Sequence, residues 1–513
     1  MSKNKTSFYL ILIIEILVVF LTVTGIFPKD AILIITGLLI FYFLFSEVED
    51  SLILFIASIP LFAALPIGNF DSMANWRLLI TVLFLVWFLR NFYHKKNPLK
   101  DICSTIIRII VPKSKLAILV NLFLVAGVSS LLVATDLFVG IKKILFLINI
   151  FLLFVIIRSI IQKAENSKQI ILRLIKAGAF AGFISLIVGY SQLIFVLLKP
   201  LHTFWQWWAR NIISVFYGDK LSQLLAVSNT WFSYYENSAP TLRMFSVFPD
   251  SHSFSLFIII SLAFLTTLLF FKKTHSYKGW LWVVIILSFL VLVFSGSRAI
   301  WLSAAVPFGI VLLLYIYGYF KDKKYSSIIR KNSQLIRLFF GFLLIFLISF
   351  PVSSLIISQS YQIDGDDASL AFKRAKSLAD LEELSVKNRM GIWKASFQSI
   401  LKHPVLGVGI GNYPIVLEED ISATKRGASA HNLYLDVASE MGLLGLIILL
   451  LIFWQIIKRA IKHNLIFAFF LLWIFVYNLF DVVLLNDKVL LLFMVMLGVL
   501  YSMSHKQLTV NHE

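Results

Sequence analysis

Apolar runs long enough to cross a membrane recur along the whole 513-residue chain. A helix needs about 20 mostly apolar residues to cross the hydrocarbon core of a bilayer. Because 59% of the residues are hydrophobic and only 14% are charged, the chain lacks the polar surface of a soluble protein this long. We therefore expect an all-α polytopic membrane protein with about fourteen transmembrane helices. The predicted spans are residues 8–27, 31–45, 51–66, 76–93, 116–134, 137–157, 174–198, 251–271, 279–296, 299–320, 336–356, 432–457, 464–482 and 488–504.

The basic residues are distributed unevenly between the two predicted faces of the membrane. With a cytoplasmic N-terminus, the inner segments carry 27 basic and 8 acidic residues, and the outer segments carry 19 of each. The entire net charge of +19 therefore lies on the cytoplasmic side, as the positive-inside rule requires. This placement indicates that the basic loops contact the headgroups of membrane lipids. We do not expect nucleic acid as their partner.

The N-terminal run and the cysteine content exclude two further features. No small-residue cleavage site follows residues 8–27, so we expect a retained first span and not a removed signal peptide. Cys103 is the single cysteine, which excludes an intrachain disulfide framework and a cysteine-based metal site.

The spans divide the chain into six parts. The two long outer segments are residues 199–250 and 357–430. The tryptophans of KPLHTFWQWWARN in the first suit an interfacial belt at the bilayer edge. The second reads as two amphipathic helices that form a lid. The predicted parts are N-terminal transmembrane helices 1–198, an extracytoplasmic loop 199–250, central transmembrane helices 251–356, a large extracytoplasmic helical loop 357–430, C-terminal transmembrane helices 431–504 and a cytoplasmic tail 505–513.

Four arginines fall at the outer level of the predicted topology. A guanidinium group is planar and matches phosphate oxygens in a bidentate manner, so Arg243 and Arg298, from separate hairpins, predict a shared phosphate-type ligand. Arg389 and Arg426 lie among many acids, where surface ion pairs are an alternative. The arginines occur in TLRMFSVFPDSHSFSLF (Arg243), FSGSRAIWLS (Arg298), KNRMGIW (Arg389) and TKRGASAHN (Arg426).

A histidine opens the twelfth predicted span, in SAHNLYLDVASEMGLLG, residues 429–445. His431 is a candidate general base for a hydroxyl nucleophile, or else a helix-terminal histidine bonded to a neighbouring loop. Asn432 or Ser429 can cap the helix. Asp436 and Glu440 are four residues apart and share a face. Because Glu440 is nearly three turns from His431, we expect it to contact another span.

The glycines of HPVLGVGIGNYP, residues 403–414, do not form a nucleotide-binding motif. No strand precedes them, and no Gly-Lys-Ser or Gly-Lys-Thr follows. We interpret this segment as a flexible turn that brings the lid back over the site.

Together these motifs resemble the O-antigen ligase and O-antigen polymerase superfamily of bacterial membrane glycosyltransferases. The resemblance covers roughly residues 240–460. It depends on AHNLYLDVASEMGLLG after a large outer loop, on HPVLGVGIGNYP, and on the upstream landmarks RMFSVFPDSHSFSLF and SGSRAIWLSAAV. It implies a GT-C-like fold in the cytoplasmic, or inner, membrane of a bacterium, with the active site facing the periplasm or cell exterior.

The resemblance also implies an activity. Members take a glycan from undecaprenyl diphosphate and transfer it to an acceptor hydroxyl, without a nucleotide sugar, a metal or another cofactor. The acceptor would be lipid A core, another surface lipid or a protein. By this resemblance Arg243 and Arg298 grip the diphosphate and His431 activates or positions the hydroxyl. The expected substrate-binding residues are Arg389, Arg426, His252, Asn432 and Glu440. A cavity between spans should admit the polyprenyl chain.

Two alternatives stay open at the level of sequence. One is a polymerase whose acceptor is a lipid-linked repeat unit. The distance from His431 to Gly442 fits its histidine motif, but the loop motif that starts at Arg389 reaches Val405 where a glycine is expected. The other is a transporter of lipid-linked glycans, which would place polar residues at mid-membrane in two related halves. At the upstream landmark, relatives also often carry Pro-Asn where this chain has Asp250-Ser251-His252.

Overall fold

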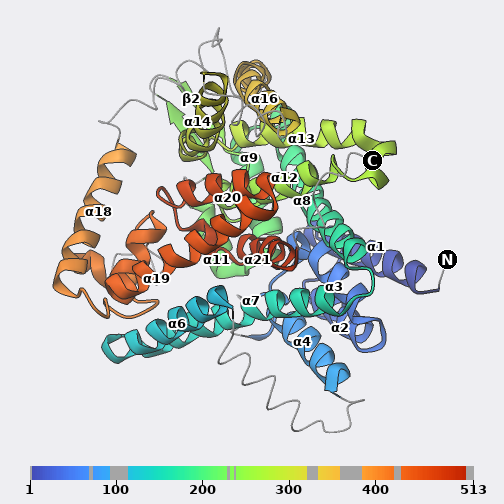
Figure 1. The fold of residues 1–513 in the computed structure, drawn as a ribbon, viewed down its shortest axis with the longest axis horizontal. Helices are drawn as coiled ribbons and strands as arrows, with labels where there is room; N and C mark the ends of the chain where they lie inside the picture. Colours follow the sequence, from blue (N-terminus) through green and yellow to red (C-terminus); the bar gives the residue numbers. More distant parts are fainter. Residues whose placement is uncertain are drawn as a thin grey trace.

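The computed structural model describes residues 3–68, 73–92, 114–227, 231–235, 238–320, 333–358, 384–420 and 429–503. Within these ranges the chain is almost entirely helical (Figure 1). Eight described helices are long and apolar enough to cross a membrane. They are α1 (Lys3–Val23), α6 (Lys115–Ser130), α7 (Leu137–Lys163), α8 (Ser167–Leu198), α12 (Ser251–Leu268), α14 (Arg298–Phe320), α16 (Ser333–Ser358) and α19 (Leu433–His463).

Shorter helices occupy the remaining predicted spans. Three are apolar: α2 (Ala31–Phe45), α13 (Lys278–Phe294) and α20 (Leu465–Tyr477). The other three are α3 (Val48–Ala57), α4 (Trp76–Phe92) and α21 (Asp487–Ser502). Span 51–66 is interrupted, because α3 ends at Ala57 and a 3₁₀ turn at Ile59–Leu61 follows it. The helices support a polytopic membrane protein, with eight of the predicted fourteen spans meeting the length and hydropathy expected of a crossing helix.

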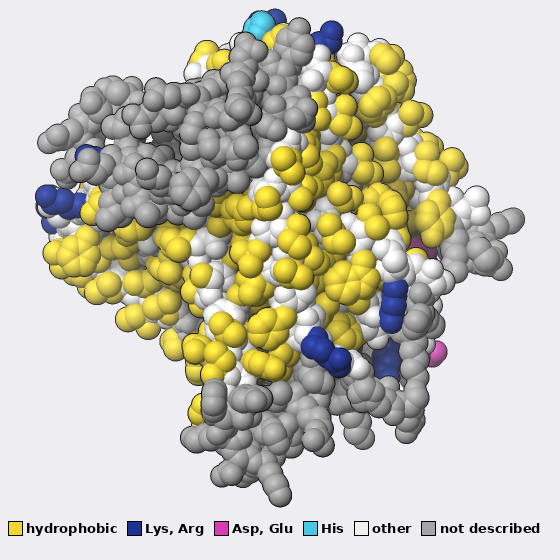
Figure 2. Space-filling view, turned by 90° about the horizontal axis from the view of Figure 1, so that it is seen from above, with side chains coloured by type: hydrophobic (Ala, Val, Ile, Leu, Met, Phe, Trp, Pro, Cys, Tyr) yellow, Lys and Arg dark blue, Asp and Glu magenta, His cyan; other side chains and the backbone are white. Residues whose placement is uncertain are grey.

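The surface of the bundle is apolar where a membrane would surround it. Figure 2 shows one face on which hydrophobic side chains predominate and basic side chains are confined to a few places. Large apolar side chains such as Ile34, Phe45 and Phe138 are more than 70% exposed. Because so much contiguous apolar surface would not be stable in water, this face is suited to lipid.

Helix α12 lies at the centre of the bundle, where nearly all of its residues are buried. It packs against α8, α13, α20 and α21. Its contact with α8 is close because Gly182 faces Ser261, and a Cβ at Gly182 would lie 2.4 Å from the Ser261 side chain. The central position of α12 carries its first turn, with His252, into the interior at one end of the bundle.

The outer segment 199–250 folds as short helices and a hairpin. The helices are α9 (Leu201–Trp208), a π turn (Ala209–Ile213), α10 (Ser214–Tyr217) and α11 (Asp219–Ala226). Strands β1 (Phe232–Tyr235) and β2 (Ser238–Leu242) pair in antiparallel fashion, so the all-α expectation misses one small hairpin. The predicted tryptophan belt is also wrong in part. Trp208 is buried, and Trp205 packs against Phe232 in this segment's own core.

The second long segment is described only in part. Helix α18 (Leu384–Lys402) corresponds to the second predicted amphipathic helix, and a 3₁₀ turn spans Tyr413–Asp420. The first predicted helix falls largely on residues 359–383, which lie outside the described residues, as does Arg426. Helix α18 packs along α19 at the edge of the molecule (Figure 1).

The expected flexible turn at 403–414 is wrong, because backbone hydrogen bonds hold this segment against a break in α19. Val408 N–H donates to Ser439 O at 2.8 Å, and Leu443 N–H donates to Pro404 O at 2.8 Å. At the break, Gly442 has φ 70°, and a Cβ there would lie 2.1 Å from Val405 O. The glycines are required by close backbone contact and not by mobility.

Candidate functional site

Four elements bring polar side chains together beside the first turn of α12. The His252 ring nitrogen Nδ1 lies 2.8 Å from the Tyr477 hydroxyl and 2.9 Å from the Ser297 hydroxyl. The Asp481 carboxylate lies 3.6 Å from the same nitrogen. Tyr477 ends α20, Ser297 lies in the turn before α14, and Asp481 lies in the loop after α20. The cluster is therefore built only by tertiary packing.

His431 faces the other oxygen of the same carboxylate. Its Nδ1 lies 3.9 Å from Asp481 Oδ1, and its side chain is 44% exposed. The residue has φ 46°, which is uncommon for a residue other than glycine. Its Nδ1 has no hydrogen-bond partner within the described part of the chain. One edge of the ring thus faces Asp481 while the residue stays accessible.

The charge of Asp481 is stabilised by its surroundings. Burial alone would raise the pKa of this carboxyl group. The imidazoles of His431 and His252, together with the Val482 N–H, outweigh burial and lower its pKa to about 2. Asp481 is therefore an anion between two histidine rings at neutral pH.

Arg243 and Arg298 meet at one turn. The Arg243 Nη2 group donates to Gly296 O at 3.1 Å, and Arg298 begins α14 two residues after that glycine. Ser297, whose hydroxyl bonds His252, lies between Gly296 and Arg298 in the chain. The Ser-Gly-Ser turn, with Gly296 at φ 62°, thus connects both predicted phosphate-binding arginines to the histidine cluster.

Arg389 reaches the cluster from α18. It is close enough to His252 and Tyr477 to interact with both electrostatically, as is Arg243 with His252. One turn further along α18, Trp393 Nε1–H donates to Ala430 O at 3.0 Å, next to His431. The helix is therefore fastened beside the candidate base, as a covering segment would be.

Asn432 and the two acids of α19 shape the turn that carries His431. Asn432 caps the helix by accepting hydrogen bonds from the N–H groups of Tyr434 and Leu435. Asp436 Oδ1 accepts a hydrogen bond from Ala430 N–H at 3.1 Å. The expected contact between Glu440 and another span is confirmed, because Glu440 pairs with Lys143 of α7 at 2.6 Å. Lys143 also lies 3.8 Å from Asp436.

Sequence reasoning missed Asp481, Tyr477 and Ser297. Asp481 lies in the short connection Asn478–Asn486, and no motif distinguishes it there. The available signal was an acid at the outer end of two apolar spans, where acids are rare unless they are paired or functional. Within the described ranges, no three His, Cys, Asp or Glu side chains are arranged to hold a metal ion.

With this geometry established, the chain can be compared with known proteins. Residues 283–450 match the family described as O-antigen ligase. The match covers less than half of the chain, so it is a likeness of this segment alone. The matched segment contains Arg298, Arg389 and His431, whereas Arg243 and Asp481 lie outside it.

A relative in Haemophilus influenzae extends the comparison without adding an activity. It is named only as an uncharacterized protein and is 30% identical over 224 residues. The similarity covers 40% of this chain, which spans about half (49%) of the relative's length. The likeness to O-antigen ligases therefore rests on residues 283–450, the segment that carries His431.

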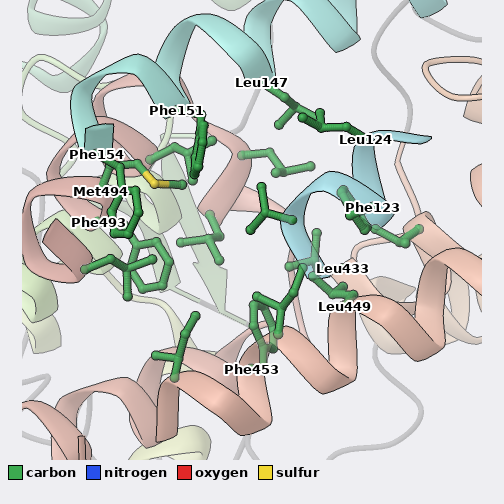
Figure 3. Close-up of a pocket in the computed structure, with 18 of the residues that line it drawn as sticks. Phe123, Leu124, Leu147, Phe151, Phe154, Leu433, Leu449, Phe453, Phe493 and Met494 are labelled. Carbon is green, nitrogen blue, oxygen red and sulfur yellow. The ribbon is translucent and has the colours of Figure 1, made fainter. Parts of the chain in front are cut away.

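Next to this polar cluster lies an apolar cavity between α6, α7, α19 and α21. The space amounts to about 1100 Å³, including the part that opens to the outside. Figure 3 shows its apolar side chains pointing toward a common space, among them Leu147 and Phe151 of α7 and Phe453 of α19. Lys143 and Glu440 are its charged lining residues, and Leu433 and Leu484 line it close to His431 and Asp481.

Proposed function

We propose that this chain is a ligase-type glycosyltransferase. It would transfer a glycan from undecaprenyl diphosphate to a hydroxyl of lipid A core, another surface lipid or a protein, at the outer face of the cytoplasmic membrane. The observation that carries the proposal is the position of Asp481 between His431 and His252, beside the turn that joins Arg243 to Arg298. An anion-binding group and a candidate base thus adjoin each other.

His431 acts as the general base. Asp481 faces Nδ1 and favours the proton on that nitrogen, which leaves Nε2 free to accept a proton. The acceptor hydroxyl transfers its proton to Nε2 as its oxygen bonds to the anomeric carbon of the donor. The bond from that carbon to the diphosphate oxygen breaks, and the diphosphate leaves with the electron pair. A single displacement of this kind inverts the anomeric configuration.

Arginines stabilise the leaving group. Arg243 and Arg298 bind the diphosphate through charge-assisted hydrogen bonds, and Arg389 adds positive charge from α18. Fixed guanidinium groups stabilise developing charge strongly in a site shielded from water. Nδ1 of His252 is bonded to Tyr477 and Ser297, so this nitrogen holds the walls of the site in place. Arg426 would add a further contact, and Asn432 and Glu440 would support the His431 turn.

A transfer assay tests the proposal. Purified protein in detergent is supplied with undecaprenyl-diphosphate glycan and candidate acceptors, with EDTA present, and transfer is followed on a gel. We expect His431→Ala and Arg298→Gln to lose transfer by about 100-fold or more. The matched controls His403→Ala and Arg77→Gln alter exposed side chains away from the cluster and should retain it.

The acceptor that gains glycan separates two activities that would use the same site. Growth of the lipid-linked glycan itself would identify a polymerase, which is the alternative acceptor class. Full transfer by His431→Ala would refute the base mechanism. Movement of the donor across vesicle membranes, with no transfer to any acceptor, would point to a transporter instead.

A further inference from the structure

Two arginines lie together at the end of the bundle far from His431. The Arg158 guanidinium lies over the Phe154 ring, 5.7 Å from its centroid, and the Arg459 guanidinium lies 4.9 Å from the centroid of Tyr501. Those two rings touch edge to face, with centroids 6.1 Å apart. The two arginines, one from α7 and one from α19, are close enough to interact electrostatically.

Neither positive charge is neutralised within the described part of the chain. Arg459 donates to the carbonyls of Leu500, Tyr501 and Met503, which cap the end of α21. The Nε atom of Arg158 is buried and has no hydrogen-bond partner among the described residues, and no described acid pairs with either arginine. Two partly buried like charges with an unused donor favour an anionic ligand.

The apolar cavity ends next to the residues that carry this arginine pair. Phe154, the ring under Arg158, lines the cavity, and so do Ile456 and Leu497, one turn before Arg459 and Tyr501. Phe154 and the neighbouring Met494 appear at one side of the cavity in Figure 3. The apolar space therefore ends at the ring that Arg158 covers and one helical turn before Arg459.

We propose that Arg158 and Arg459 bind the phosphate of an anionic phospholipid from the cytoplasmic leaflet, with an acyl chain in the cavity. The charge distribution places the last turns of α7 and α19 on the cytoplasmic side, among Lys163, Lys458 and Lys462. Basic pockets between spans on that side suit anionic headgroups.

The polyprenyl donor fits this cavity less well. At the other end of the cavity the single cation Lys143 is paired with two carboxylates, Glu440 and Asp436, which would repel a diphosphate. Lys143 and Arg158 are fifteen residues apart on α7, or about 22 Å at 1.5 Å per residue. A diphosphate bound at the Lys143 end of the cavity thus cannot also contact Arg158.

Lipid binding to the purified, delipidated full-length protein tests this proposal. Native mass spectrometry would count retained molecules of phosphatidylglycerol and phosphatidylcholine with matched acyl chains, and of undecaprenyl phosphate. We expect preferential binding of phosphatidylglycerol, weakened about tenfold by Arg158→Gln, because a hydrogen bond to a charged group contributes at least that much. Lys462→Gln removes an exposed cation from the same end of α19 and should change nothing.

Two further variants test the proposal even if Arg158→Gln folds poorly. Arg158→Lys retains the charge and should keep most of the binding, and Leu147→Trp fills the cavity and should reduce it without touching the arginines. Equal phosphatidylglycerol binding by wild type and a folded Arg158→Gln would overturn the proposal. So would arginine-dependent binding of undecaprenyl phosphate that exceeds that of phosphatidylglycerol. Thermal stabilisation by inorganic phosphate as large as that by phosphatidylglycerol would overturn the role of the cavity.

Discussion

The Asp481 carboxylate lies 3.9 Å from Nδ1 of His431, although the whole of α19 and α20 separates the two residues in the chain. We predict that Asp481→Asn lowers the turnover number for glycan transfer by about 100-fold or more, because it removes the charge that orients and supports the histidine as a base. Asp219→Asn, which changes an exposed acid, serves as the control. The melting temperature of Asp481→Asn should remain high enough to show a folded protein. Unchanged turnover would exclude a role for Asp481 in proton transfer.

A second prediction concerns the pH dependence of stability. Burial, and then the nearby Asp481 charge, raise the pKa of Asp250 at the start of α12 to about 6. The folded state therefore holds this proton more tightly than the unfolded state, whose carboxyl titrates near pH 4. The free energy of unfolding falls as pH rises through the window from about 4 to 6, and the loss is complete above it.

Asp250→Asn isolates this effect, since asparagine also caps helices well and cannot ionise. We expect the variant to be more stable than wild type at pH 8, by about 1 kcal/mol or more. The advantage should shrink toward pH 4. Melting temperatures in detergent across this range measure it. A difference that does not vary with pH would contradict the titration of Asp250.

A third prediction concerns the ion pair between α7 and α19. Lys143→Met leaves Glu440 and Asp436 buried without their cation, and breaking a buried pair in this way costs about 3–5 kcal/mol. Asp436 also accepts a hydrogen bond from the N–H of Ala430, next to His431. Glycan transfer should therefore fall along with stability. The double variant Lys143→Met/Glu440→Gln should recover part of the stability. Additive losses in this double-mutant cycle would mean that the two side chains are not coupled.

A fourth prediction concerns the break in α19. Gly442→Ala places a methyl group against Val405 O in a left-handed backbone conformation, so we expect a loss of about 2 kcal/mol or more. Gly309→Ala adds a methyl group with no atom within 4 Å and should be neutral or slightly stabilising. Equal unfolding temperatures of the two variants would show that the 403–412 segment does not dock as described.

Much of the fold is determined by the local amino-acid sequence. Every predicted span overlaps a described helix, because a long apolar run favours a helix without reference to the rest of the chain. Two features were not predicted, namely the hairpin Phe232–Leu242 and the early end of α3 within span 51–66, where tertiary contacts decide the backbone. The glycines of 403–414 were noticed in the sequence, but the reason for them was not. They are required by close contact with the backbone of α19, which only the tertiary structure shows.

The candidate site divides in the same way. His431 and the arginines could be selected from the sequence because charged groups at the edge of apolar spans need a reason to be there. Asp481 could not be selected, since a lone acid in a short loop acquires meaning only from what packs beside it. The amino-acid sequence by itself therefore determined the membrane class, the helices and the resemblance of residues 283–450 to O-antigen ligases. The tertiary structure decided which carboxylate faces His431 and which cation neutralises Glu440, because distances between side chains on different helices depend on packing and not on spacing along the chain.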